Sequence, residues 1–165
     1  SFILEKLMRT AWMYWKSRDL RPEWNMQYAF RGHIIVLCDE LTASDGEAFA
    51  EGFKRLGLGK VLGMRTWGGE IWLHSGNTLS DNGIARAPMM GVYGPERKWL
   101  VEQVGVIPDI KVDNLPHDTF NGGDAQLDAG IEYLLAEIEK DPRAIPDPPE
   151  FPDLSFEKRP AEFRK

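Results

Sequence analysis

The order of apolar and polar residues along the first half of the chain predicts a helix, a loop, a strand and a second helix. Apolar residues at positions 3, 4, 7, 8, 11, 14 and 15 share one helical face, which predicts an opening helix over 2–15. The polar and aromatic stretch 16–32 is expected to form a loop. The β-branched run 34–37 predicts a buried strand, and the apolar spacing over 48–56 predicts the next helix.

The second half of the chain continues with strands and a long helix. After a glycine-rich stop at 57–59, residues 60–64 read as a strand, so that one helix lies between two strands in a β-α-β unit. Runs at 71–73 and 84–93 predict two further strands joined by a turn at 80–83.

The end of the chain changes in character near Asp141. The apolar residues over 124–140 have helical spacing, whereas the residues that follow are rich in proline and charge. The sequence therefore predicts an α/β fold with one domain over 1–140 and a proline-rich tail or arm over 141–165.

Composition and charge narrow the range of function classes. The chain has 165 residues, of which 42% are hydrophobic and 28% charged, as is typical of one globular domain. Its net charge of -6 argues against a nucleic-acid partner. No apolar run approaches the length of a membrane-spanning helix, so no membrane partner is expected. The six tryptophans are expected to serve packing, in the core or at an interface.

The turn before the helix at 48–56 carries the strongest candidate for chemistry. Strand, short turn and helix place Ser44 at a helix start, where a nucleophile would be exposed. The unpaired amide of Asp45 could then stabilise an oxyanion beside Ser44. An alternative explanation needs no catalysis, because Ser44 with Glu47 three residues later also fits a capping box.

Other chemistries find no support in the residue pattern. His33, His74 and His117 are far apart in sequence, and Cys38 is the only cysteine, so no metal site and no cofactor is expected. Cys38 directly follows a predicted strand and is expected to be a buried small hydrophobe. The glycines at 57–59 lack the spacing of a phosphate-binding loop.

Five blocks of sequence together resemble the tricorn protease family, within the tail-specific serine proteases. They follow in the order Ile34–Asp39, Thr42–Glu47, Gly57–Gly63, Arg65–Gly69 and Val101–Asp109. The resemblance extends over roughly 34–131. It implies a crotonase/ClpP-like β-β-α core and the C-terminal catalytic subdomain of a larger protease.

The resemblance also assigns roles to particular residues. It implies that Ser44 is the nucleophile, that the Asp45 amide donates to the oxyanion, and that Glu102 orients a base histidine. Relatives that process protein C-termini use a serine and a lysine, but the position of that lysine is Gly69 here. The chain is therefore expected to use a histidine and not a lysine.

The base histidine of this family lies upstream of the matched region, as does its second oxyanion donor. The three histidines of this chain are expected to be ordinary ones, because nothing in their spacing brings them within reach of Ser44. We therefore expect this chain to be a fragment of a larger protease, inactive when isolated.

The remaining expectations concern substrates and assembly. The resemblance implies peptide substrates that pair by strand addition near Leu73, His74 and Ser75, for which a plain edge strand is the alternative. It further implies a homo-oligomeric ring, for example a hexamer, and a cytoplasmic location.

Two other classes of function stay open. One is a non-catalytic module of the same fold that binds a retinoid or lipid, and the other is a crotonase-type enzyme acting on a thioester. Labelling with a fluorophosphonate separates a serine peptidase from both of them, since it reports only an activated serine.

Overall fold

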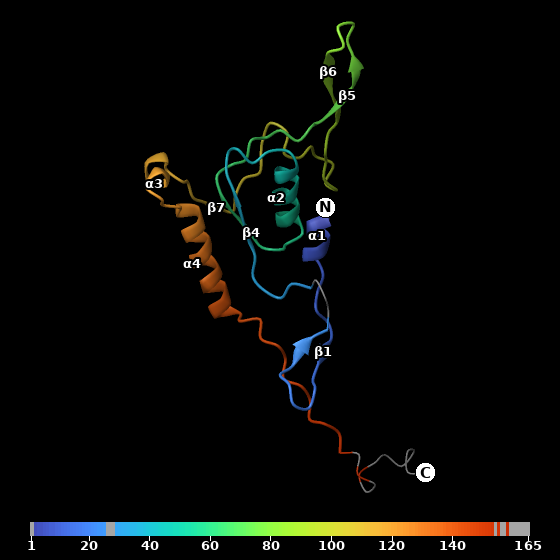
Figure 1. Cartoon of the computed structure of the whole chain (residues 1–165), viewed down its shortest axis with the longest axis vertical. Helices are drawn as coiled ribbons and strands as arrows, with labels where there is room; N and C mark the ends of the chain where they lie inside the picture. Colours follow the sequence, from blue (N-terminus) through green and yellow to red (C-terminus); the bar gives the residue numbers. More distant parts are fainter. Residues whose placement is uncertain (1, 26–28, 154, 156–157, 159–165) are drawn as a thin grey trace, which may run out of the picture. The chain divides into compact units, whose positions relative to one another are not determined.

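A parallel three-stranded sheet forms the centre of the larger of two compact units. The computed structural model describes residues 2–25, 29–153, 155 and 158. The larger unit contains the described parts of 1–10 and 28–143, and the smaller unit contains those of 11–27 and 144–165. In chain order (Figure 1) the elements are α1 (Phe2–Leu7), β1 (Tyr14–Trp15), β2 (Glu23–Trp24), β3 (Ile35–Cys38), α2 (Asp45–Arg55), β4 (Lys60–Gly63), β5 (Trp72–Thr78), β6 (Ile84–Met90), β7 (Ile110–Lys111), α3 (Pro116–Phe120) and α4 (Ala125–Lys140).

The central sheet has the strand order β3, β4, β7, and neighbouring strands are parallel. Val36 pairs with Val61 between β3 and β4, and Leu62 pairs with Ile110 between β4 and β7. Parallel neighbours need a crossover connection, and α2 provides the one between β3 and β4. The predicted β-α-β unit is confirmed.

Two helices cover opposite faces of this sheet. Successive side chains of a strand point to opposite faces. On one face Cys38 of β3 lies in one apolar cluster with Phe53 of α2. On the other face Gly130 of α4 lies against β3, since a Cβ built on Gly130 would be 3.3 Å from Leu37 Cδ2. Figure 1 shows α2 and α4 on either side of the strands, an α/β arrangement in three layers.

The apolar cluster under α2 fixes the helix that carries the candidate site. Phe53, Val61 and Val106 are fully buried, and Leu4 of α1 lies against the same cluster. A Cβ built on Gly52 would be 2.7 Å from Leu4 Cδ1, so the absence of a side chain there lets α1 approach α2. Because this packing holds α2, the position of its first turn is well defined.

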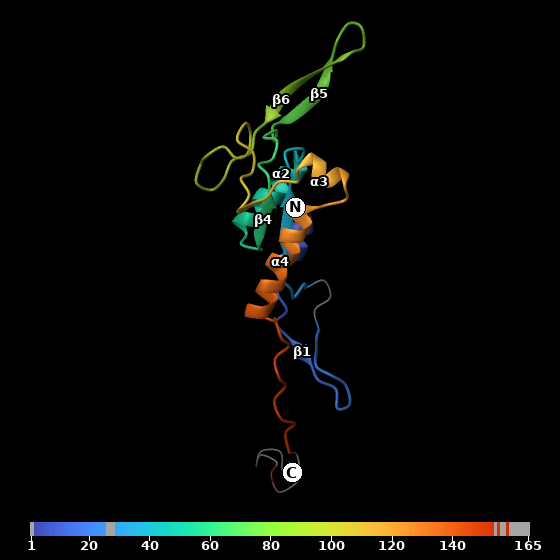
Figure 2. The same ribbon diagram turned by 90° about the vertical axis from the view of Figure 1, so that its left-hand side faces the viewer.

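Strands β5 and β6 form an antiparallel hairpin, which extends away from α2 in both views (Figures 1 and 2). The turn contains Asn82 with φ of 64°, a left-handed conformation that asparagine tolerates. The predicted strands and turn are therefore confirmed, although β5 is longer than expected and β6 ends at Met90, three residues earlier than expected. Trp72 pairs with Met90 and Leu73 with Pro88, so Met89 is the extra residue of a β-bulge.

The predicted opening helix is wrong beyond Leu7. Only Leu4 among the residues of α1 is buried, while Ile3 is 60% exposed, so the expected apolar face has little to pack against. In the smaller unit, Tyr14 pairs with Trp24 in an antiparallel pair of short strands. Aromatic residues favour strands, and here that preference outweighs the helical spacing. Strand β2 also lies in the expected loop 16–32, of which residues 26–28 lie outside the described part.

Two further features of the chain differ from the sequence prediction or extend it. Helix α3 was not predicted, although Pro116 in its first turn is a typical start signal. Residues 141–153 form neither helix nor strand. The remainder of the expected tail lies mostly outside the described residues, and the domain boundary at 140 stays a prediction. No helix among the described residues is long and apolar enough to span a bilayer.

The six tryptophans do not belong to the core. All of them are exposed, with Trp99 at 75% and Trp12 at 72%. The expectation of core packing is wrong, because the core of this small sheet is filled by Phe53 and aliphatic side chains. Packing at an interface stays open for them.

Cys38, by contrast, is buried as predicted. Burial, followed by the nearby charge of Asp39, raises the pKa of its thiol to about 11.

Candidate active site

The turn between β3 and α2 holds Ser44 in a strained backbone conformation. Asp39 Oδ1 accepts the amides of Leu41 (3.0 Å) and Thr42 (2.9 Å), which closes the turn after β3. Ser44 then has φ of 53° and ψ of -122°, and α2 begins at the next residue. Such a conformation costs a non-glycine residue about 1–3 kcal/mol and occurs mainly at functional sites. Ser44 is exposed to solvent at this position.

Glu47, in the first turn of α2, is fully buried and accepts four hydrogen bonds. Its Oε1 accepts the Thr66 hydroxyl (2.5 Å) and the Gly68 amide (2.7 Å). Its Oε2 accepts the amides of Gly69 (2.8 Å) and Ser44 (3.1 Å). Glu47 therefore makes the predicted capping contact to Ser44 and also joins the turn between β3 and α2 to the segment 66–69.

The hydrogen bonds around Glu47 keep it ionised. Burial alone would raise its pKa, but the hydroxyl of Thr66 and the amides of Gly69, Gly68 and Ser44 outweigh burial and lower the pKa. The Thr66 hydroxyl is oriented in turn, because its oxygen accepts the Val106 amide at 2.6 Å. A carboxylate whose pKa is lowered thus lies beneath the turn that carries Ser44.

Glu102 lies on a loop that is fixed against the same segment. Its Oε2 accepts the amides of Glu70 (2.8 Å) and Ile71 (2.9 Å), and the amide of Gln103 donates to the Gly68 carbonyl at 2.8 Å. Val101 and Gln103, on either side of Glu102, both have left-handed φ values of 66° and 63°. The contacts of the loop with residues 68–71 therefore impose a conformation that these residues rarely adopt.

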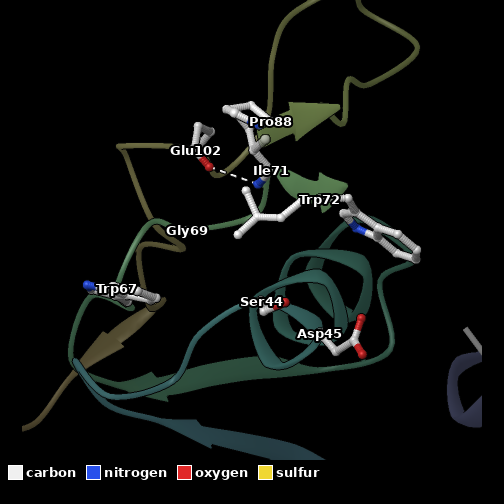
Figure 3. A pocket seen from close by; sticks show the side chains of 9 residues that line it. Ser44, Asp45, Trp67, Gly69, Ile71, Trp72, Pro88 and Glu102 are labelled. Carbon is white, nitrogen blue, oxygen red and sulfur yellow. Dashed lines mark hydrogen bonds between the residues drawn. The ribbon is translucent and has the colours of Figure 1, made fainter. Parts of the chain in front are cut away.

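Ser44, Asp45 and Glu102 line one open pocket of about 560 Å³. Figure 3 shows Ser44 and Asp45 at the start of α2 and Glu102 on the opposite wall, with Trp67 and Trp72 at its sides. The pocket thus brings together residues that are 58 positions apart in the chain (102 minus 44). Their catalytic roles stay predictions.

The predicted peptide-binding residues are only partly at this pocket. Leu73 lines it, whereas His74 and Ser75 lie further along β5 and do not. One edge of β5 pairs with β6, and no described strand pairs with the other edge.

None of the three histidines lines the pocket around Ser44. His33 Nε2 lies 2.6 Å from the carbonyl oxygen of Asp141. His117 is on α3, with its Nε2 3.3 Å from Asn121 Nδ2, and His74 is on β5. Among the described residues, no group of three or more histidine, cysteine or acidic side chains could hold a metal ion.

Glu70 is a buried acid that the sequence did not reveal. It is 3% exposed, and its Oε2 has no hydrogen-bond partner among the described residues. Burial, followed by the negative charges of Glu47 and Asp45, raises the pKa of Glu70 to about 7. A charged residue between Gly69 and a strand normally indicates an exposed edge, so only the packing of α2 against this segment identifies Glu70 as buried.

Comparison with known proteins places this arrangement in a family. The model described as peptidase family S41 matches residues 6–112, a span that includes Ser44, Glu47, Glu70 and Glu102. The chain belongs to peptidase family S41. This S41 chain is 34% identical over 147 residues to tricorn protease of Thermoplasma acidophilum, an alignment that covers 89% of this chain and 14% of that protein.

A second relative and a solved structure agree with this assignment. Tricorn protease homolog 1 of Streptomyces coelicolor is 36% identical over 144 residues, which is 87% of the S41 chain and 14% of the homologue. A crystal structure of the tricorn protease matches with a TM-score of 0.76 and 35% identity, covering 84% of this chain and 14% of that one. The S41 chain therefore spans about 14% of the length of these relatives.

Proposed function

We propose that this chain carries the nucleophile of a serine peptidase that cleaves peptide bonds through an acyl-enzyme. The observation that carries the proposal is the shared pocket, in which a strained, exposed Ser44 faces Glu102. Membership of peptidase family S41 supports the reaction class. We also infer that β3, α2 and β4 belong to a crotonase/ClpP-like core, as part of the C-terminal catalytic subdomain of a larger protease.

The proposed first step is attack by Ser44 Oγ on the peptide carbonyl carbon. A base takes the hydroxyl proton as the new C–O bond forms, and the carbonyl oxygen becomes an oxyanion. The amide of Asp45 is at the first position of α2, where no acceptor exists within the helix, and it donates to that oxyanion. Such a donor typically contributes about 3 kcal/mol to lowering the barrier. The tetrahedral intermediate then expels the amine, which takes the proton from the base.

The second step regenerates the serine. Water attacks the ester carbonyl, the same base accepts its proton, and the acid leaves as the proton returns to Ser44 Oγ. The base is proposed to be a histidine supplied from outside this chain, because His33, His74 and His117 are all away from the pocket. Glu102 would accept its ring N–H and orient it. Among the described residues, Glu102 Oε1 has no hydrogen-bond donor, which leaves it available for this contact.

The substrate is proposed to bind as an extended peptide along β5. Leu73 lines the pocket, and His74 and Ser75 follow on the same strand, whose second edge is unpaired among the described strands. Backbone pairing at this edge would position the scissile bond near Ser44. A homo-oligomeric ring and a cytoplasmic location complete the proposal, with the exposed Trp12 and Trp15 of the opening segment as candidate subunit contacts.

The test combines peptide hydrolysis with labelling of the serine. Fluorogenic peptides and a fluorophosphonate are applied to this chain and to any longer natural polypeptide that contains it, each beside its Ser44→Ala variant. We expect hydrolysis and labelling by the longer polypeptide, both abolished by Ser44→Ala, and no hydrolysis by the isolated chain. Hydrolysis that survives Ser44→Ala would contradict the role of Ser44. A longer polypeptide that is neither labelled nor able to hydrolyse peptides would favour the binding module or the thioester enzyme.

A further inference from the structure

A second pocket of about 420 Å³ adjoins the one that contains Ser44. The two pockets share Ile71, Pro88 and Glu102 on their walls. Figure 3 shows these three residues grouped on the side of the site that lies opposite Ser44. A peptide bound at Ser44 therefore has direct access to the second pocket.

The second pocket is lined mainly by apolar side chains. Met89 and Met90 come from the end of β6, while Val92 and Trp99 come from the loop that leads to Glu102. Consecutive strand residues normally point to opposite faces, but the bulge at Met89 lets both methionines line the same pocket. We refer to it as the methionine pocket.

The wall formed by Trp99 is held in place by its surroundings. A Cβ built on Gly91 would be 3.0 Å from the Trp99 ring, so the ring lies directly against that glycine. The ring of Tyr93 meets Trp99 edge-on, with centroids 6.0 Å apart and planes at 84°. The loop is tied to α2 by Arg55, whose guanidinium donates to both carboxylate oxygens of Glu96 at 2.7 and 3.1 Å. These contacts fix the position of the wall that Trp99 forms.

We propose that the methionine pocket binds one large apolar side chain of the peptide whose scissile bond lies at Ser44. This inference rests on the proposed peptidase function and names the substrate class of the same site. Met89, Met90 and Trp99 are at least 50% exposed, so a large apolar side chain that enters the pocket would bury apolar surface on them. Methionine side chains adapt their shape, which suits aliphatic and aromatic residues alike. The carboxylate of Glu102 on the shared wall disfavours an acidic side chain.

The test measures peptide binding without turnover. Fluorescein-labelled hexa-alanine peptides, each with one phenylalanine at a different position, are titrated into the chain that carries Ser44→Ala, and anisotropy is recorded. We expect one phenylalanine position to tighten binding at least about tenfold over hexa-alanine, as burial of an aromatic side chain predicts. Adding Met90→Glu should reduce that gain to less than about twofold.

Matched variants control for loss of fold. Met8→Glu makes the same change at a residue 46% exposed, against 50% for Met90, and should leave the gain intact. Trp99→Ala should also remove the gain, whereas Trp12→Ala, at nearly equal exposure, should not. Equal binding of all peptides, no binding of any of them, or a gain that survives Met90→Glu would overturn the inference.

The same measurements separate this inference from the proposed function. Fluorophosphonate labelling of Ser44 in a longer polypeptide is measured independently of peptide binding. If Ser44 is never labelled but the gain still depends on Met90, the methionine pocket stands and the peptidase proposal fails. If Ser44 is labelled and the polypeptide hydrolyses peptides with no preference for phenylalanine, the peptidase proposal stands and the inference about the methionine pocket is wrong.

Discussion

The Oε2 atom of Glu47 accepts a hydrogen bond of 2.8 Å from the amide of Gly69, which joins the first turn of α2 to the segment leading into β5. The same oxygen accepts the amide of Ser44. One carboxylate therefore positions both the candidate nucleophile and the backbone that lines the opposite side of the pocket.

Replacing Glu47 by glutamine should destabilise the chain by about 3 kcal/mol. Each carboxylate oxygen accepts two hydrogen bonds, so the amide NH₂ of glutamine faces two donors in either orientation and leaves them unsatisfied. Urea unfolding measures the loss.

Glu51→Gln is the control for this change, because Glu51 is on the same helix in a partly exposed ion pair with Arg55, whose side chains are 22% and 36% exposed. That variant should change the free energy of unfolding by less than about 1 kcal/mol. Equal effects of the two substitutions would show that the buried network around Glu47 does not contribute as argued.

Glu70 should make the stability of the chain fall as pH rises toward neutrality. Its pKa is raised from 4.5 to about 7 in the folded chain, so the folded state holds a proton that the unfolded state has already released. The stabilisation is fully present below about pH 4.5 and is lost as pH rises through about 7. The groups that act on it are Asp45, Glu47, Glu102 and, in the opposite sense, the Ala48 amide.

Glu70→Gln mimics the protonated acid and should remove this pH dependence. The free energy of unfolding is measured with urea at pH 5 and pH 8. At pH 8 that of the variant should exceed that of the original chain by up to about 3 kcal/mol. Glu132→Gln on the exposed side of α4 serves as the control. If the variant and the original chain have the same free energy of unfolding at both pH values, Glu70 does not hold a proton in a buried position.

Ser44→Gly should stabilise the chain relative to Ser44→Ala by about 1 kcal/mol. Both changes remove the hydroxyl, but only glycine adopts φ of 53° and ψ of -122° without a steric cost. Thermal unfolding of the two variants gives the difference directly. If alanine proves as stable as glycine at this position, the strain assigned to the turn is absent.

The central elements of the fold were predictable because local pattern and tertiary packing agree there. One face of β3, with Val36 and Cys38, meets the core cluster together with Phe53 of α2, although Leu37 on the other face is 40% exposed and the strand is less buried than expected. The opening helix failed for the opposite reason, since its apolar face meets almost nothing and the aromatic pair Tyr14–Trp15 forms a strand instead.

The candidate site was predictable in part. Ser44 and Asp45 follow from the strand, turn and helix pattern, and Glu102 followed from resemblance to a family. The shared network of Glu47 and the burial of Glu70 depend on how the segment 66–71 packs against α2, a contact between parts of the chain about 20 residues apart. No local spacing encodes such a contact.

The burial of Cys38 has a practical consequence for following the chain in solution with an attached dye. Its thiol is buried, donates to the Met64 carbonyl at 3.3 Å, and has a pKa raised to about 11, so it presents almost no thiolate at neutral pH. A cysteine introduced at the exposed tip of the β5–β6 hairpin would therefore react alone with a maleimide dye. A single dye can therefore be attached at the hairpin without first replacing the buried Cys38.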